Sequence, residues 1–259
     1  MRIIDAHLHL FDEPGYLDTL LGTMDRLGIE KVCLSGLGKL FGMADNQAVR
    51  KAFTDHPDRI IGQVYVRPGV DGGQTIDQGF EQGFRMVKVH VPKKAYDEEE
   101  YDELWRRADQ HNMPILFHTG IVNTGQELPD EGISSWFMHP MRLERISRKF
   151  PRLKMIAAHL GVSWNIDAAE LARMRPNIFV DLTGAPQGWR RRADAVGMDQ
   201  YLWWPDAFNK VIFGTDVHYR DMEQILREDM QRFDRLNIDA PTRLRVLAGN
   251  IAELLNLES

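Results

Sequence analysis

The amino-acid sequence predicts one (β/α)₈ barrel, a TIM barrel, over residues 1–259. Its length of 259 residues is close to the roughly 250 that such a barrel needs. Its composition, 43% hydrophobic and 27% charged, is typical of a folded globular chain and excludes disorder and a disulfide-stapled miniprotein. Short β-rich runs also alternate with longer helical patterns along the whole chain, which is typical of a parallel barrel.

Eight runs have the composition of β-strands. Most are nearly continuous apolar segments, which is typical of parallel strands covered on both faces. They are residues 1–6, 31–36, 60–66, 85–90, 113–118, 154–159, 178–183 and 210–215.

The segments between these runs carry helical periodicity. In 98–112 the apolar residues follow the i, i+3, i+4, i+7 spacing behind an acidic first turn. Similar apolar stripes predict helices over 219–236 and 241–256. A doubly wound open sheet is the alternative, but no Gly-x-Gly-x-x-Gly follows the first strand and eight alternating units are rare in that fold. Because no linker or charge block divides the chain, we expect a single domain.

Two predicted connections are unusually long. Residues 119–138 and 184–209 contain several glycines and tryptophans without a clear period. Long irregular loops in compact domains often serve as lids or binding loops. Within the second of them, Arg190, Arg191 and Arg192 are expected to form a solvated helix face.

Charge and cysteine content limit the partners. With 32 basic and 38 acidic residues the net charge is −6, so nucleic-acid binding is disfavoured. The single cysteine, Cys33, cannot form an internal disulfide. No stretch approaches a membrane span, and no apolar leader is evident. We therefore expect a cytoplasmic enzyme acting on a small molecule, with the oligomeric state left open.

Histidines and an aspartate lie where the predicted strands end. His7 and His9 leave the first strand, His118 and His159 close the fifth and sixth, and Asp216 closes the eighth. In a barrel these ends meet at one mouth, and imidazole with carboxylate is the ligand set of a catalytic zinc or related divalent ion. Each residue alone has a structural alternative, such as a core histidine or a helix N-cap. All five at the same strand end favour a metal site.

Several motifs around these residues resemble the amidohydrolase-2 family, a branch of the amidohydrolase superfamily that includes relatives of aminocarboxymuconate-semialdehyde decarboxylase. They are His7-Leu8-His9, Phe117-His118-Thr119-Gly120, Ala158-His159-Leu160-Gly161 and Phe213-Gly214-Thr215-Asp216. The resemblance implies a metal-dependent TIM barrel in which His7, His9, His118 and Asp216 ligate the metal. It also implies that His159 acts beside the metal as an acid/base or water-orienting group.

Lys88 closes the fourth predicted strand and has two interpretations. In binuclear members of the superfamily a lysine on this strand is carboxylated and bridges two metal ions, and His159 then becomes a ligand. An unmodified Lys88 would instead bind a substrate carboxylate or stabilise an anion beside a single ion, which is the interpretation that we favour.

Two further residues are candidates for substrate binding. Arg67, just after the third strand, could hold a substrate carboxylate through its guanidinium, although an outward ion pair is equally compatible. Trp136 could close over a planar ligand from the 119–138 connection, whereas packing against the next helix is the structural alternative.

The predicted site is compatible with more than one reaction. The leading hypothesis is hydrolysis of an amide, ester or lactone by a metal-activated water, with Asp216 moving the proton and His159 assisting. The alternative is non-oxidative decarboxylation of a small aromatic or unsaturated acid. The chain length of 259 residues, which leaves little room for long insertions, is taken to favour the hydrolase. A non-catalytic metal-binding barrel ranks third.

Overall fold

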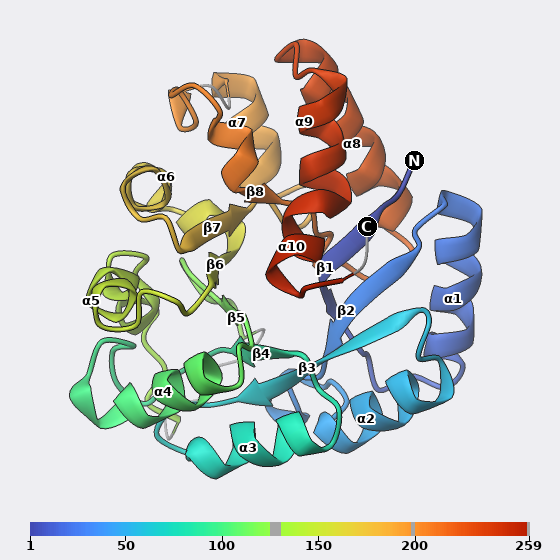
Figure 1. The fold of residues 1–259 in the computed structure, drawn as a ribbon. Coiled ribbons are helices and arrows are strands. Elements are labelled where there is room, and N and C mark those ends of the chain that lie inside the picture. Colours follow the sequence, from blue (N-terminus) through green and yellow to red (C-terminus); the bar gives the residue numbers. More distant parts are fainter. Residues whose placement is uncertain (125–130, 198–199, 258–259) are drawn as a thin grey trace.

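The computed structural model describes residues 1–124, 131–197 and 200–257, and it confirms the predicted barrel. Its strands follow one another around a single sheet in chain order, each parallel to the next (Figure 1). The strands are β1 (Ile4–His9), β2 (Lys31–Ser35), β3 (Ile60–Val66), β4 (Met86–Val89), β5 (Ile115–Phe117), β6 (Met155–Ala157), β7 (Ile178–Asp181) and β8 (Val211–Ile212).

The barrel closes between β8 and β1. The Ala6 amide donates to the Phe213 carbonyl at 3.0 Å, and the Asp216 amide donates to the His7 carbonyl at 2.7 Å. β8 ends sooner than the predicted run 210–215, because the Phe213 amide donates to Val246 of the C-terminal segment instead of continuing the ladder to β7.

Helices surround the barrel (Figure 1). They are α1 (Tyr16–Leu27), α2 (Asn46–Asp55), α3 (Gly73–Glu81), α4 (Asp102–Gln110), α5 (Arg142–Lys149), α6 (Asn165–Met174), α7 (Trp189–Val196), α8 (Met222–Arg235), α9 (Ala240–Leu244) and α10 (Asn250–Leu254), with short helical turns that include η1 (Lys39–Phe41), η4 (Ser135–Met138) and η5 (Ala158–Gly161). None of these helices is long and apolar enough to cross a membrane.

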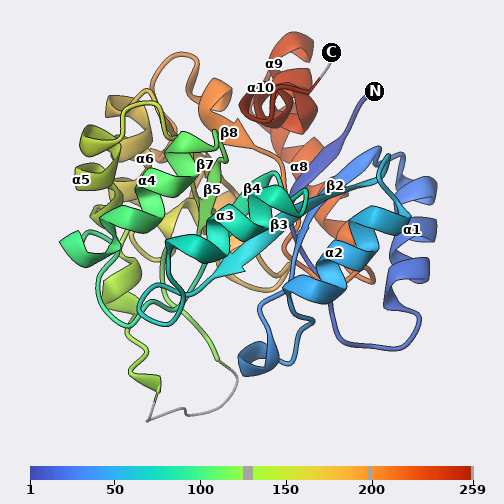
Figure 2. The same cartoon turned by 60° about the horizontal axis from the view of Figure 1, so that its bottom comes forward.

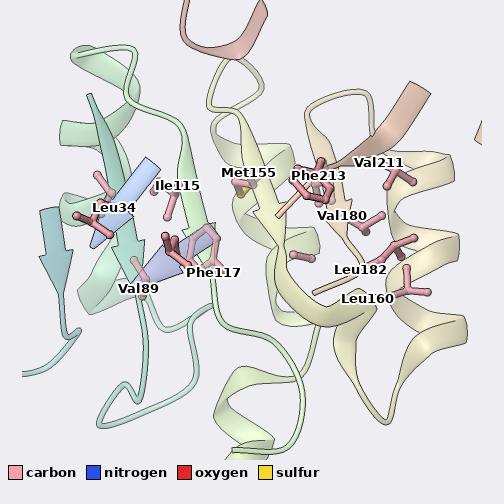
Figure 3. Close-up of a cluster of buried hydrophobic side chains, with 14 of the residues drawn as sticks. Leu34, Val89, Ile115, Phe117, Met155, Leu160, Val180, Leu182, Val211 and Phe213 are labelled. Carbon is pink, nitrogen blue, oxygen red and sulfur yellow. The ribbon is translucent and has the colours of Figure 1, made fainter. Parts of the chain in front are cut away.

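Alternating strand residues divide the core into two layers. The outward-facing side chains, such as Val89 and Phe117, pack against the helices in one large buried cluster (Figure 3). The inward-facing side chains, such as Met86 and Leu116, fill the barrel in a second cluster, which α10 covers from below with Ile251. Burial of both strand faces explains why the strands appear as continuous apolar runs in the sequence.

The pleat places polar residues above the barrel core. Successive side chains of a strand point to opposite faces, so Met86, Lys88 and His90 all face the barrel axis, one above another. Figure 2 shows both chain termini at one side of the molecule, whereas the connections after β2 and β5 extend from the opposite side. The second side is the mouth at which the strands end.

The structure corrects one of the two loop predictions. Residues 184–209 contain the helix α7 (8 residues), so this connection is not irregular throughout. Arg190 on α7 is buried and not solvated, because its guanidinium donates to the Leu182 carbonyl and to Asp229 of α8. In the 119–138 connection, residues 125–130 lie outside the described structure, and η4 follows them.

Candidate metal centre and active site

His7 is held with a defined nitrogen toward the mouth. Its Nδ1 donates to Asp181 Oδ2 at 2.9 Å, so Nε2 carries the lone pair. This Nε2 lies 3.4 Å from Asp216 Oδ1. Two acceptors that face each other without a shared proton repel unless a cation lies beside them, and the Lys88 ammonium, 2.8 Å from His7 Nε2, is such a cation.

His9 presents its Nε2 to the same oxygen. Its Nδ1 lies 2.9 Å from Ser35 Oγ of the neighbouring strand, and its Nε2 lies 3.1 Å from Asp216 Oδ1. β1 changes register against β2 between Asp5 and Leu8. Leu8 then packs outward in the hydrophobic layer, and the histidines on either side of it face the mouth.

Gly214 and a strained backbone bring Asp216 to this position. A Cβ at Gly214 would lie 2.7 Å from the Cβ of His7, so only glycine allows β8 to approach β1 this closely. Asp216 itself has a φ of 52°, a left-handed conformation that is uncommon for residues other than glycine. Such strain is concentrated at functional sites.

Burial sets the charge of the cluster. Desolvation lowers the pKa of His7 to about 4 and lowers the pKa of His9. Burial by itself would raise the pKa of Asp216, but its electrostatic interactions with His7 and His9 outweigh burial and hold this pKa well below its usual value. The cluster therefore consists of neutral imidazoles and a carboxylate, the protonation states in which these groups bind a metal.

The three side chains fit a divalent cation. Each of His7, His9 and Asp216 offers one atom, and these atoms lie within 4.8 Å of one another. The separations of 3.1 and 3.4 Å from Asp216 Oδ1 match the roughly 3 to 3.5 Å expected between ligands bonded at about 2.1 Å to one ion. This part of the predicted ligand set is brought together by the fold.

His159 lies next to the cluster, between Asp216 and His118. Its Nδ1 is 3.7 Å from Asp216 Oδ2 and 2.8 Å from Thr183 Oγ1, and its Nε2 is 3.2 Å from His118 Nδ1. It also has a positive φ of 59°, on the short turn η5. This placement fits the acid/base role expected for His159.

The resemblance implies that His118 is a ligand beside Asp216, but in the structure His159 lies between these two residues. His118 touches His159, but it does not belong to either group of side chains that could share an ion. Its buried Nε2 has no hydrogen-bond partner among the residues that the structure describes. A nitrogen that binds a metal does not form a hydrogen bond, so this observation is compatible with ligation by His118. That ligation stays a prediction.

Asp181 orients the site. A second possible metal group joins Asp181 with His7 and His159. The carboxylate already accepts from His7 Nδ1, from the amides of His159 and Thr183, and from the Thr183 hydroxyl. These bonds use the lone pairs of Asp181. In metal sites a carboxylate commonly accepts a hydrogen bond from the second ring nitrogen of a ligating histidine and so orients its ring.

Lys88 reaches the same cluster from β4. Its Nζ donates to His7 Nε2 at 2.8 Å, and its side chain is buried. Burial lowers the pKa of Lys88 to about 8, although the charges of Asp216 and Asp181 act in the opposite direction. The predicted placement of Lys88 at the site is therefore met, and its role as anion or substrate partner stays a prediction.

His90 is a residue of the mouth to which the sequence alone assigned no role. It follows β4, lies 4.1 Å from the His118 ring centroid, and stacks on Phe41 at 4.7 Å with an interplanar angle of 25°. The signal that could have found it is the alternation along β4, which sets it on the same face as Lys88.

Arg67 and Trp136 are engaged elsewhere in this structure. Arg67 donates to the Val91 carbonyl and pairs with Glu131 at 2.6 Å, so its guanidinium joins the barrel to the 119–138 connection. Val91 and Glu131 thus engage three of the five guanidinium N–H groups of Arg67. Trp136 is 55% exposed and packs near His139, at 4.9 Å between ring centroids.

Comparisons with known proteins agree with this geometry. A family model described as Amidohydrolase matches residues 4–257, so the chain belongs to the amidohydrolase family. A comparison with curated proteins gave no match.

Solved structures of similar fold include hydrolases and decarboxylases. An uncharacterised TIM-barrel protein from Bordetella bronchiseptica has a TM-score of 0.76 at 16% identity, with 99% of each chain covered. A protein assigned as a 2-pyrone-4,6-dicarboxylic acid hydrolase in Acinetobacter baumannii, solved with citric acid, has a TM-score of 0.66 at 15% identity and covers 99% of this chain and 100% of its own. 5-Carboxyvanillate decarboxylase from Novosphingobium aromaticivorans, solved with manganese and a nitrobenzoic acid, has a TM-score of 0.67 at 16% identity and covers 98% and 96%.

Proposed function

We propose that this amidohydrolase-family enzyme hydrolyses an acyl C–N or C–O bond, in an amide, ester or lactone, of a small molecule that carries a carboxylate. The observation that carries the proposal is the convergence of His7 Nε2 and His9 Nε2 on Asp216 Oδ1. The other oxygen of the same carboxylate faces His159.

The metal centre would be built from these residues. His7, His9 and Asp216 would hold one divalent ion, with His118 as a further ligand and zinc as the proposed metal. Manganese is the competing ion, because it is bound in the similar decarboxylase. When bound, such an ion polarises a carbonyl and lowers the pKa of a water molecule.

The protein residues would move the proton. The free oxygen of the Asp216 carboxylate accepts the proton of the attacking water as the new C–O bond forms. Asp216 then delivers this proton to the leaving nitrogen or oxygen as the acyl bond breaks. His159, 3.7 Å from Asp216, orients the water, and the Lys88 ammonium stabilises the negative charge that develops on the substrate.

Decarboxylation is the second candidate, and the similar structures favour it. The decarboxylases are covered over nearly their full length, as with 99% of the enzyme from Sphingomonas paucimobilis, so chain length does not separate the two reactions as the sequence argument assumed. In this reaction His159 or Asp216 would protonate the carbon that loses CO₂, with cleavage of one C–C bond. A buried, imidazole-lined mouth suits this proton transfer equally well.

One experiment distinguishes these reactions. Purified protein loaded with zinc or with manganese is given carboxylate-bearing lactones, esters and amides, and separately ortho-hydroxylated benzoic acids. Acid release from lactones and esters, followed by pH-stat, or amine release from amides supports hydrolysis, and CO₂ release supports decarboxylation. A His159→Ala protein that retains its metal serves as the negative control. Absence of turnover with a fully loaded, folded protein would contradict both proposals.

A further inference from the structure

His90 is buried in the mouth, and its ring forms no hydrogen bond with any residue that the structure describes. Its side chain is 5% exposed, and neither Nδ1 nor Nε2 has a partner among residues 1–124, 131–197 and 200–257. Buried polar groups in folded proteins are nearly always paired, and each exception calls for a ligand, a water or a strain explanation. The backbone of His90 has an ordinary conformation, so strain does not account for it.

The surroundings of His90 define what could pair with it. Phe41 from η1 covers one face of its ring, and the His118 ring lies on another side. Lys88 precedes it by two residues on the same face of β4 and contributes positive charge. An imidazole carries at least one N–H in every protonation state, so this corner offers a hydrogen-bond donor next to a cation.

We infer that His90, which stacks on the Phe41 ring, forms the subsite that binds a carboxylate of the ligand. This subsite lies across the mouth from His7, His9 and Asp216. This inference deepens the proposed function, on which it rests for the position of the metal. A carboxylate oxygen is the natural acceptor for an N–H beside an ammonium group. The flat aromatic wall also favours a planar ligand.

Neighbouring groups are less suited to this task. Arg67, the basic residue expected from the sequence to bind the carboxylate, is paired with Glu131. Lys88 Nζ lies 2.8 Å from His7 Nε2, beside the proposed metal ligands. His90 is the group at this side of the mouth that has both nitrogens available.

A pair of probes that differ by one carboxylate tests the inference. Binding of salicylate and of phenol is measured by calorimetry on the metal-loaded protein. We compare wild type with His90→Phe, which keeps the stack on Phe41 but removes both nitrogens. His90→Gln restores an N–H donor. We expect His90→Phe to weaken salicylate binding by about tenfold to a hundredfold and phenol binding by less than about twofold, with His90→Gln between them.

His111 provides a matched control. It stacks on Phe80 at 4.3 Å, as His90 stacks on Phe41, but at the end of α4 away from the mouth. His111→Phe should leave both probes unaffected. Equal losses for salicylate and phenol in His90→Phe, or absence of salicylate binding to wild type, would overturn the inference.

A measurement without substitution covers the case in which His90→Phe does not fold. In ¹⁵N NMR of the wild-type protein, salicylate should shift the His90 ring nitrogens and leave those of His111 unchanged; unchanged His90 signals would overturn the inference. Neither readout needs turnover. A protein that binds salicylate through His90 but processes no substrate would contradict the proposed function alone.

Discussion

The Asp181 carboxylate accepts a hydrogen bond from His7 Nδ1 at 2.9 Å and thereby determines which nitrogen His7 presents to Asp216. The two residues are 174 positions apart in the sequence, on β1 and β7. Because Nδ1 keeps its proton, Nε2 is the nitrogen that points at Asp216 Oδ1. The metal-binding geometry of His7 therefore depends on a residue that ligates nothing in the proposed centre.

Replacing this carboxylate by an amide tests its role. In Asp181→Asn one side-chain atom becomes an NH₂ group, which faces either the His7 N–H or the amides of His159 and Thr183. We expect metal affinity to fall by about 10- to 100-fold, measured by competition with a chelator. Asp77→Asn, which alters a similar pair with His111 outside the mouth, should leave it unchanged. Equal affinity in both variants would contradict the orienting role.

The ligand and acid/base roles are separable by metal analysis. His7→Ala and Asp216→Ala should lose both the metal and the activity, because the remaining groups cannot complete the coordination shell. His159→Ala should keep its metal while losing activity by about 100-fold or more. Elemental analysis and steady-state kinetics check both. Metal loss in the His159 variant would instead support two ions bridged by a carboxylated Lys88.

The state of Lys88 has its own test. An unmodified Lys88 beside His7 allows about one metal ion per chain, and bicarbonate should not raise that ratio. Lys88→Met should keep the ion and lower kcat, because the cation that stabilises developing charge is gone. A ratio near two in the presence of bicarbonate would favour the carboxylated form.

Trp136 distinguishes a substrate-covering role from a packing role. Its ring is more than half exposed and contacts His139 and Trp164, while Arg142 lies 5.7 Å from its centroid. We propose that Trp136→Ala raises KM or lowers kcat for the substrate while shifting the free energy of unfolding by less than about 1 kcal/mol. Thermal melting and kinetics are measured on the same preparation. A large drop in Tm with normal kinetics would identify Trp136 as a packing residue.

Acid should weaken an ion pair on the outer helices. Burial would raise the pKa of Asp102, but hydrogen bonds from Arg145 and Lys149 outweigh it and hold the pKa below 3.8. The ionised carboxylate therefore stabilises the fold above pH 4, and this contribution is lost as the pH falls through the lowered pKa. Between pH 5 and 2, the urea midpoint of wild type should fall more steeply than that of Asp102→Asn. Parallel curves would show that the pair contributes nothing.

The alternation of apolar runs and helical stripes determined the barrel and the position of its mouth. In a parallel barrel all strands end on one side, so His7, His9, His159 and Asp216 could be placed together although they span more than two hundred residues of sequence. This inference needs only local periodicity and the handedness of βα units, which the sequence encodes within each segment.

Pairing across the barrel was decided by the tertiary structure. Arg67 forms an ion pair with Glu131, and the buried Arg190 forms one with Asp229. Neither acidic partner lies within a helical or strand period of its arginine. In the same way, His159 lies between His118 and the ligand group, and His90 has no hydrogen-bond partner within the described part of the chain. Local patterns specify which face a side chain occupies. The distance between two faces depends on strand register, loop path and packing, which arise only when the whole barrel closes.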